Sequence, residues 1–355
     1  MPASYETHLH QLDLILRAWG MKLVNAAITV EIMAYADLHG IDSHGISMIP
    51  SYDQRRRAGK MNMTAEPKII HDRLVAALID GGGGLGHVNS YTAMNLAISK
   101  ARSMGVGIVA VHNSAHFGAC GYYARMAANA GFIGMVTTSA SGIQVAPTGG
   151  AEAKYGTDPI AFAAPGRDGE PFLLDMATTT VAAGRIRNKA NENLPTPPGW
   201  LVTKDGAPST DPLEASQKGG FLTPLGGTAD GSSHKGYGLA AMVNILSSAL
   251  SGATMITDPG HTKQPGTMGI GHFFMAIDPG LFRDASEFRA DVAAFCDSLR
   301  ATRPADPAHP VMVAGDPERR NAAQRRQSGI PVGPGLLAQV RKVAEAAGAE
   351  WVLGK

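Results

Sequence analysis

The residues with the clearest chemical potential form the run His234-Lys235-Gly236-Tyr237-Gly238, which follows a Gly/Ser loop. This run opens a long uncharged stretch, so it predicts the start of a buried helix. The first turn of a helix has unpaired N–H groups and a partial positive charge, and Lys235 adds a full charge. We therefore expect an anion site at His234 and Lys235 that suits the phosphates of a cofactor.

Two histidines lie in polar turns that contain glycine. His44 belongs to Asp42-Ser43-His44-Gly45, and His116 belongs to the polar run that ends at Gly118. Small neighbours leave room for a ligand in both turns, and an imidazole titrates in the range that proton transfer requires. A third polar cluster begins at Asp175. We expect His44 and His116 to serve as acid–base groups.

Other chemistries fit the same residues less well. His112 and His116 have the i, i+4 spacing of a zinc site on a helix, but the metalloprotease pattern needs a glutamate where Asn113 stands. The segment between them is also typical of a loop that joins a strand to a helix. The Asp-Ser-His neighbours at 42–44 are residue types of a hydrolase triad, but adjacent side chains do not point at one another as a triad must. The sequence predicts neither a metal site nor a serine hydrolase.

A glycine run resembles a dinucleotide fingerprint but lacks its context. Gly81, Gly83 and Gly86 satisfy G-x-G-x-x-G between a strand-like and a helix-like stretch. The next strand-like stretch ends at residues 111–113 without the carboxylate that would hold a ribose hydroxyl. We favour a turn that packs closely on the following helix.

Strand-like and helix-like stretches alternate in the middle of the chain and must position these clusters. A hairpin with an Asp168-Gly169 turn then breaks the alternation, which favours a mixed sheet. Strand-like stretches cover 74–79, 106–111, 132–137, 160–164, 172–175, 272–277 and a short 311–313, and helix-like ones 12–19, 24–38, 91–103, 121–130, 286–299 and two basic stretches near the end. Residues 188–231, rich in Pro and Gly, predict a long excursion over the surface.

We therefore expect an α/β fold: a mixed sheet with flanking helices, and a helical lobe formed by the two ends of the chain. The expected division is an N-terminal helical segment (1–75) that packs with a C-terminal helical segment (285–355), around an α/β region (76–284) that holds the site.

Composition narrows the class of protein. The chain has 355 residues, a net charge of +1 and no dense basic stripe, which argues against a nucleic-acid partner. Two cysteines, Cys120 and Cys296, make no disulfide framework, and we expect both to be small buried side chains. The N-terminus has no signal-peptide pattern, and the uncharged stretch after residue 236 carries too many polar residues for a membrane span. We expect a cytoplasmic protein with no membrane partner.

Seven ordered motifs, spread over almost the whole chain, resemble the malate/L-lactate dehydrogenase-like family, which is distinct from the usual lactate and malate dehydrogenases. The motifs are Asp42-Ser43-His44-Gly45-Ile46, His116-Phe117-Gly118-Ala119, Ala146-Pro147-Thr148-Gly149-Gly150, Gly156-Thr157-Asp158-Pro159, Asp175-Met176-Ala177-Thr178, His234-Lys235-Gly236-Tyr237-Gly238-Leu239 and Gly271-His272-Phe273-Phe274. The resemblance implies an NAD- or NADP-dependent enzyme with a non-Rossmann cofactor-binding fold, and a homodimer.

The implied reaction transfers a hydride between nicotinamide and a small carboxylic acid, either a 2-hydroxy acid or its 2-oxo acid. Two alternatives stay open: reduction of a cyclic imino acid such as piperideine-2-carboxylate, and a homologue that binds the cofactor without catalysis. An acid–base group must move a proton with the hydride. The resemblance makes His44 and His116 the candidates, without deciding between them, and leaves the cofactor, NAD or NADP, and the direction of reaction open.

Further site residues follow from the resemblance. Asp175 would orient an imidazole or hold the cofactor, although a helix N-cap before 177–187 explains it equally well. Ser43, Met48 and Tyr52 lie on the implied substrate side. The implied cofactor contacts are Ser139, Asp175, Met176, Ala177, Thr178, His234, Lys235, Gly315 and Asp316.

Two positions depart from the family pattern. Many members carry an arginine four residues after the histidine, where it suits the substrate carboxylate, but this chain has Met48. Another cation, such as Arg55, Arg185 or Arg187, would have to take over, or the acid group would lie elsewhere. Asp158 replaces the usual asparagine and would add a negative charge near the cofactor.

Overall fold

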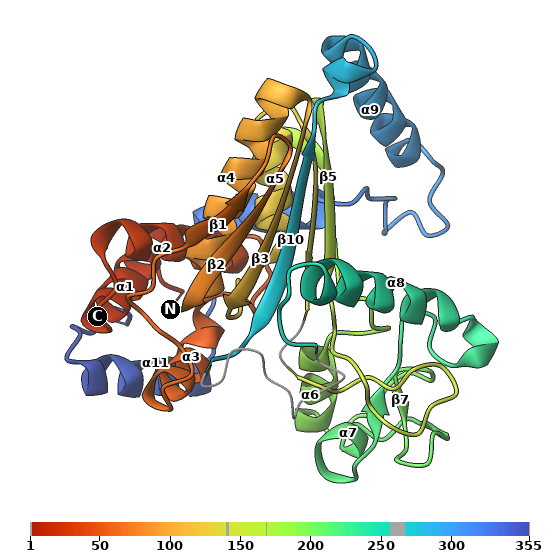
Figure 1. Ribbon diagram of the computed structural model, residues 1–355. Coiled ribbons are helices and arrows are strands. Elements are labelled where there is room, and N and C mark those ends of the chain that lie inside the picture. Colours follow the sequence, from red (N-terminus) through yellow and green to blue (C-terminus); the bar gives the residue numbers. More distant parts are fainter. Residues whose placement is uncertain (1, 140–141, 168, 256–266, 355) are drawn as a thin grey trace.

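A seven-stranded sheet forms the centre of the protein (Figure 1) in this computed structural model, which describes residues 2–139, 142–167, 169–255 and 267–354. Its strands lie in the order β1-β2-β3-β10-β4-β5-β6. They are β1 (Lys68–Asp72), β2 (Ala76–Gly84), β3 (Val106–Ser114), β4 (Ile133–Thr138), β5 (Ile160–Arg167), β6 (Glu170–Met176) and β10 (Ile270–Ile277).

The sheet is mixed, as the sequence predicts. Only β2 and β3 pair in parallel, and every other neighbouring pair is antiparallel. The hairpin that joins β5 and β6 is confirmed, although Asp168 of its turn lies outside the described residues. The late strand β10 runs between β3 and β4, so this sheet is not the parallel, doubly wound sheet of a Rossmann domain.

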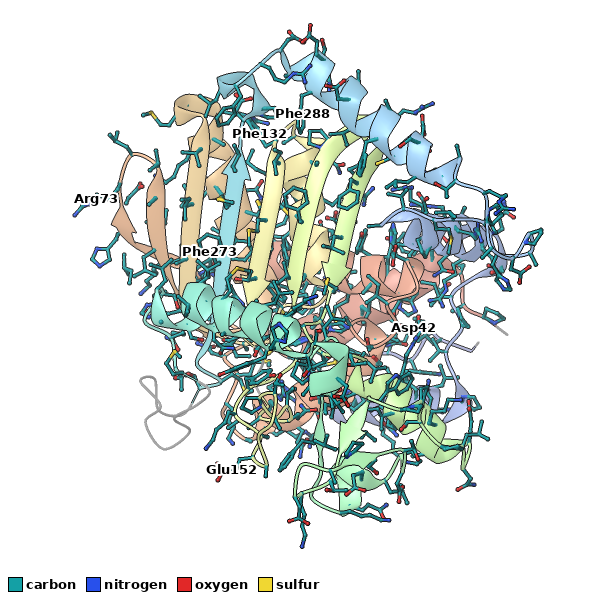
Figure 2. The ribbon with its side chains drawn as sticks, turned by 90° about the vertical axis from the view of Figure 1, so that its right-hand side faces the viewer. Asp42, Arg73, Phe132, Glu152, Phe273 and Phe288 are labelled. Carbon is teal, nitrogen blue, oxygen red and sulfur yellow. The ribbon has the colours of Figure 1, made fainter. Side chains whose placement is uncertain are left out.

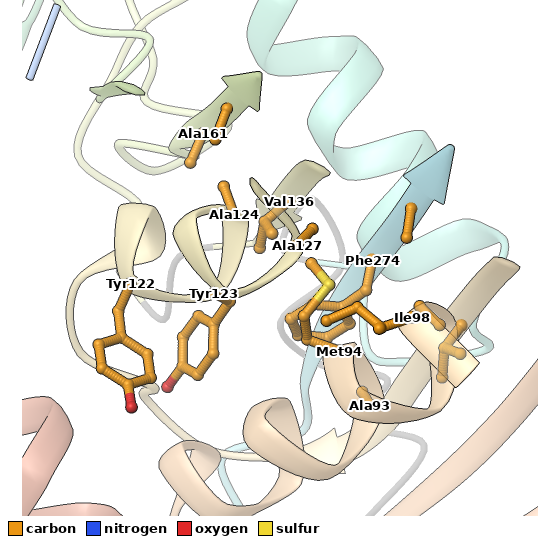
Figure 3. Packing of buried hydrophobic residues seen from close by; sticks show 14 of the residues in the cluster. Ala93, Met94, Ile98, Tyr122, Tyr123, Ala124, Ala127, Val136, Ala161 and Phe274 are labelled. Atoms are coloured by element: carbon orange, nitrogen blue, oxygen red, sulfur yellow. The ribbon is translucent and has the colours of Figure 1, made fainter. Parts of the chain in front are cut away.

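Two helices, α4 (Gly86–Met104) and α5 (Cys120–Asn129), cover one face of the sheet. Their inner faces carry small side chains such as Ala93 and Ala124, which allow the helices to lie close to the strands. Figure 3 shows these alanines with Met94, Tyr123 and Phe274 in one packed cluster. This close-packed core makes the end of the sheet a rigid support.

The opposite face carries α8 (His234–Asn244) and the π-helical turn η3 (Ile245–Ala249) that continues it. Below them, the expected surface excursion contains a small folded unit of its own. It consists of α6 (Ala183–Asn191), α7 (Glu214–Gln217) and a three-stranded sheet of β7 (Leu201–Val202), β8 (Pro208–Ser209) and β9 (Phe221–Leu222). The prediction for 188–231 was therefore wrong in part, because strands of two residues give no periodic signal.

A helical lobe lies at the other side of the sheet end and contains both chain ends (Figure 1). It consists of α1 (Tyr5–Ala18), α2 (Leu23–Leu38), α3 (Ile49–Arg57), α10 (Asp316–Ser328) and α11 (Pro334–Ala347). The last of these helices packs on α1 and α3, and α10 packs on α2. Helix α3 ends with three arginines, Arg55, Arg56 and Arg57. The short strand expected at 311–313 is absent from the described structure.

One C-terminal helix stands apart from this lobe. Helix α9 (Ala285–Arg300) packs on β5, at the end of the sheet remote from α8. The described residues therefore link 316–353, rather than all of 285–355, to the N-terminal helices. The division at residues 75 and 284 stays a prediction.

Candidate active site

Strand register gathers the polar clusters at one end of the sheet. The last residue of β3, Ser114, pairs with Ile270 at the start of β10. On the other side of β10, His272 pairs with Thr138 at the end of β4. Because neighbouring strands lie about 4.8 Å apart, the loops that follow β3, β4 and β6 begin side by side. His116, Ser139 and Asp175 thus lie at the same end of the sheet. Figure 2 shows Asp42 towards this end and Phe132 at the opposite end.

Two imidazoles from distant loops meet there. The ring centroids of His44 and His116 are 5.4 Å apart, and their planes differ by 27°. Nδ1 of His116 lies 2.6 Å from the Tyr52 hydroxyl, and Nδ1 of His44 lies 2.7 Å from the Ser43 hydroxyl. In each ring, Nε2 has no partner among the described residues and stays available for a ligand.

The loop that carries His44 is held from below by a buried carboxylate. Asp37 accepts a hydrogen bond of 2.7 Å from the Ile46 amide and lies 2.7 Å from Nε2 of His8. The loop runs so close to Asp37 that a side chain at Gly45 would collide with the carboxylate. From the side, Arg325 of α10 binds Asp42. The turn of His44 is therefore fixed by α2 and α10 together.

Burial keeps both imidazoles uncharged. Loss of solvation lowers the pKa of His44 to about 4 and lowers the pKa of His116 well below its ordinary value. The neighbouring His44 acts on His116 in the same direction, because two positive charges this close would repel. At neutral pH the pair is therefore two neutral rings, and each ring can accept a proton when a substrate hydroxyl releases one.

Asp175 stands at the start of α5. Its Oδ2 accepts a hydrogen bond of 2.7 Å from the Gly121 amide, so the carboxylate caps this helix from another part of the chain. The helix expected to begin at 177 starts at Ala183 instead. Loss of solvation raises the pKa of Asp175 to about 6, against the lowering effect of the Gly121 hydrogen bond.

The start of α8 is tied to the segment after β6. The backbone amide of Leu225 donates to the carbonyl of Thr178 at 2.9 Å, and a side chain at Gly236 would collide with the backbone of Leu225. Lys235 is exposed and forms no ion pair among the described residues, and no side chain caps the first turn of α8. A free ammonium beside an uncapped helix start fits a phosphate group.

The remaining expected cofactor residues divide into two groups. Ser139 is buried at the sheet end, where its amide donates to the Gly271 carbonyl and its hydroxyl accepts from the Gly271 amide. Thr178 is buried and donates to the carbonyl of Thr157, whereas Met176 and Ala177 are half-buried. At the start of α10, the carboxylate of Asp316 is bound by Arg300 and Arg319, so this side chain is engaged within the protein. Next to it, Gly315 adopts a positive φ of 96°.

Sequence reasoning missed two buried histidines beside the site. Nδ1 of His272 lies 2.6 Å from the Thr138 hydroxyl, and its Nε2 lies 2.9 Å from the Ser114 hydroxyl, so this ring joins three strands. His87, at the start of α4, is fully buried and packs edge-on against Tyr52. The Gly271-His272 motif marked the first as a strand residue, but nothing in the sequence marked the second.

The structure also shows where the two residues that depart from the family pattern, Met48 and Asp158, lie. Met48 packs against the core of the helical lobe. Asp158 is fully buried and accepts a 2.8 Å hydrogen bond from Asn244 of α8, so its charge points into the protein.

The glycine run continues β2, and a side chain at Gly86 would collide with the Ala115 carbonyl. That glycine serves the close contact of α4 with the loop after β3, as the sequence analysis favoured.

Comparison with known proteins identifies the family. A sequence profile of malate/L-lactate dehydrogenases matches residues 4–341. The chain belongs to the malate/L-lactate dehydrogenase family. It is 37% identical over 337 residues to a malate dehydrogenase of Pyrococcus horikoshii, covering 95% of this chain and 92% of that protein. It is 36% identical over 335 residues to an L-sulfolactate dehydrogenase of Methanocaldococcus jannaschii, covering 94% of each.

The fold agrees with this membership. The crystal structure of a malate dehydrogenase from Entamoeba histolytica superimposes with a TM-score of 0.93 at 33% identity, over 99% of each chain. The resemblance drawn from the seven motifs is thereby confirmed, and this member of the malate/L-lactate dehydrogenase family is an oxidoreductase. No helix within the described residues is long and apolar enough to cross a lipid bilayer.

Proposed function

We propose that the protein is an NAD- or NADP-dependent dehydrogenase that interconverts a 2-hydroxy acid and its 2-oxo acid. The observation that carries this proposal is the contact of His44 with His116, at 5.4 Å between ring centroids, at the end of the sheet. Two neutral imidazoles with free Nε2 atoms suit an alcohol that loses a proton as it becomes a ketone. No observation on the described residues favours a cyclic imino acid.

The residues of this chain would carry out the proton transfer of the reaction. A bound nicotinamide supplies or takes the hydride, and Nε2 of His44 or His116 takes or supplies the matching proton at the substrate oxygen. The Tyr52 hydroxyl supports either state of His116, because a hydroxyl donates to a bare Nδ1 and accepts from a protonated one. Ser43 stands in the same relation to His44.

The cofactor would lie between the sheet end and α8. Lys235 and the start of α8 would bind its phosphates, and Ser139 and the 175–177 segment would line the site beside the imidazoles. Support comes from the hydrogen bond between Leu225 and Thr178, which ties the two parts together. Lys235 and the start of α8 would bind the phosphates of NAD and NADP alike.

The proposal includes a homodimer in the cytoplasm. Phe295 and Leu299 lie one turn apart on α9, and both leave apolar surface exposed, as does Phe282 just before that helix. Exposed apolar surface of this kind is typical of a subunit contact. Light scattering of the purified protein measures its molar mass. A value of twice 37.0 kDa supports the dimer, and a value of 37.0 kDa contradicts it.

The test of activity follows absorbance of the reduced cofactor with a panel of 2-oxo acids, and formation of the reduced cofactor with the matching 2-hydroxy acids. We expect turnover with one of the two cofactors. His44→Ala and His116→Ala should each reduce turnover by well over tenfold, since a positioned acid–base group contributes about 10²–10⁴-fold. A folded wild-type protein without turnover on the whole panel would refute the proposal.

A further inference from the structure

Helix α3 carries three consecutive arginines, and one of them lacks an acidic partner. Arg56 and Arg57 both bind Asp53, at 2.6 and 2.7 Å. Arg55 forms no ion pair within the described residues, and its Nη1 is buried without a hydrogen-bond acceptor. A buried guanidinium nitrogen without an acceptor is costly. This atom therefore needs an acceptor that the described residues do not supply.

Helical spacing places this unpaired cation beside the two imidazoles. Met48, directly before α3, and Tyr52 and Arg55 within it stand at i, i+4 and i+7, so they lie along one face of the helix. Tyr52 contacts His116 directly. Burial is the main cause of the lowered pKa of His116, and the charge of Arg55 adds to the lowering, so the guanidinium lies within electrostatic range of the ring.

The direction of the side chain strengthens this arrangement. Long side chains on a helix lean towards its N-terminus, and Tyr52 and Met48 stand on the N-terminal side of Arg55 on the same face. The backbone of Arg55 lies two turns, about 10 Å along the axis, beyond the position where many family members carry an arginine. Arg55 thus carries a positive charge on the helix face that lost one at Met48.

We propose that Arg55 binds the carboxylate of the substrate in this protein. The inference rests on the proposed function, since it names the group that holds the substrate acid. A guanidinium offers two parallel N–H donors that match the two oxygens of a carboxylate. Met48 adds an apolar surface beside it, where a second acid group would find no partner. The ligand is therefore a 2-hydroxy or 2-oxo acid with a single carboxylate.

The test compares Arg55→Met with Arg57→Met, whose side chain is half exposed and bonded to Asp53. The substrates are the 2-oxo acid that the wild type reduces best and the methyl ester of that acid. We expect Arg55→Met to raise KM for the acid at least tenfold and to leave the ester unchanged, so that the preference for acid over ester falls. Arg57→Met should behave as wild type. An unchanged KM and preference in Arg55→Met overturn the proposal.

A binding measurement separates this proposal from the proposed function. If the wild type turns over no substrate, the proposed reaction fails, and calorimetry with oxamate in the presence of the reduced cofactor still tests Arg55. Loss of oxamate binding in Arg55→Met, but not in Arg57→Met, supports the carboxylate site. Equal binding in both variants, or no binding to the wild type, overturns it. Arg55→Gln provides the same test if Arg55→Met does not fold.

Discussion

The hydroxyl of Tyr52 lies 2.6 Å from Nδ1 of His116, although the two residues are 64 positions apart in the sequence. One comes from a helix of the N-terminal lobe and the other from the loop after a central strand, so this hydrogen bond joins the lobe to the sheet. It also fixes the orientation of the imidazole beside the ring of His44. The acid–base pair therefore depends on how the lobe docks.

Removal of this hydroxyl should slow the reaction with little effect on substrate binding. A single hydrogen bond contributes about 0.5–1.5 kcal/mol, so we expect Tyr52→Phe to lower kcat about three- to tenfold while KM stays within twofold. Tyr122→Phe is the matched control, because its hydroxyl donates to Glu31 of α2 rather than to an imidazole. Steady-state kinetics of both variants measure the effect. Equal kcat values for Tyr52→Phe and wild type would contradict the assigned contact.

Acid should destabilise the protein through its buried histidines. Burial lowers the pKa of His272 to about 3, whereas the unfolded chain has a value of about 6.5. Between these two values the unfolded state binds a proton that the folded state does not, so the free energy of unfolding falls as pH drops from 6.5 towards 3. The slope is about 1.4 kcal/mol per pH unit for each such histidine.

Urea unfolding at pH 7.5, 6.5, 5.5 and 4.5 measures this slope. We expect the slope of the free energy of unfolding against pH to be smaller in His272→Asn, by the contribution of one histidine, about 1.4 kcal/mol per pH unit. His309→Asn should keep the whole slope, because His309 is exposed and pairs with Asp306 at the surface. Identical slopes in His272→Asn and wild type would show that this ring is not buried uncharged.

Asp37, which lies beneath the His44 loop, should contribute more to the stability of the fold than Asp42, which lies within the loop. Asp37→Ala leaves His8 and the Ile46 amide buried without their partner, so we expect a loss of about 3–5 kcal/mol in the free energy of unfolding. Asp42→Ala removes an exposed ion pair with Arg325 and should cost about 0–1 kcal/mol. Chemical denaturation of the two variants compares them directly. A larger loss in Asp42→Ala would reverse the roles given to these residues.

Lys235 should contribute to cofactor affinity. A charge-assisted hydrogen bond is worth about 1.5–3 kcal/mol, so Lys235→Ala should raise the Kd of the reduced cofactor about ten- to a hundredfold. Lys154→Ala serves as control, because that exposed lysine pairs with Glu152. Calorimetry without substrate measures both values. An unchanged Kd in Lys235→Ala would remove the phosphate contact from the proposed function.

Sequence reasoning succeeded where the signal is local. The alternating stretches predicted α4, α5 and the strands around them, because helix and strand periods can be recognised within about ten residues. The two catalytic candidates could also be named, since each histidine lies in an open polar turn. Their contact at 5.4 Å needed the fold, because only the docking of α3 on the sheet end brings them together.

The missed features share a different property: their partners are far away in the sequence. Asp37 lies on an apolar helix face, and its importance follows from His8 and from a loop nine residues later. His272 gains its role from hydroxyls of two neighbouring strands. No periodic pattern encodes such contacts. Likewise, only the structure shows that Arg56 and Arg57 both pair with Asp53, which leaves Arg55 without an ion pair among the described residues.

The position of β10 has a consequence for how the protein is made. This strand is encoded by residues 270–277, yet it fills the gap between β3 and β4. A nascent chain that has not yet emerged from the ribosome up to residue 277 holds two partial sheets with unpaired edges, and such edges recruit other chains. Folding must therefore finish late in synthesis, and a prematurely terminated product should be a target for chaperones and proteases rather than a working enzyme.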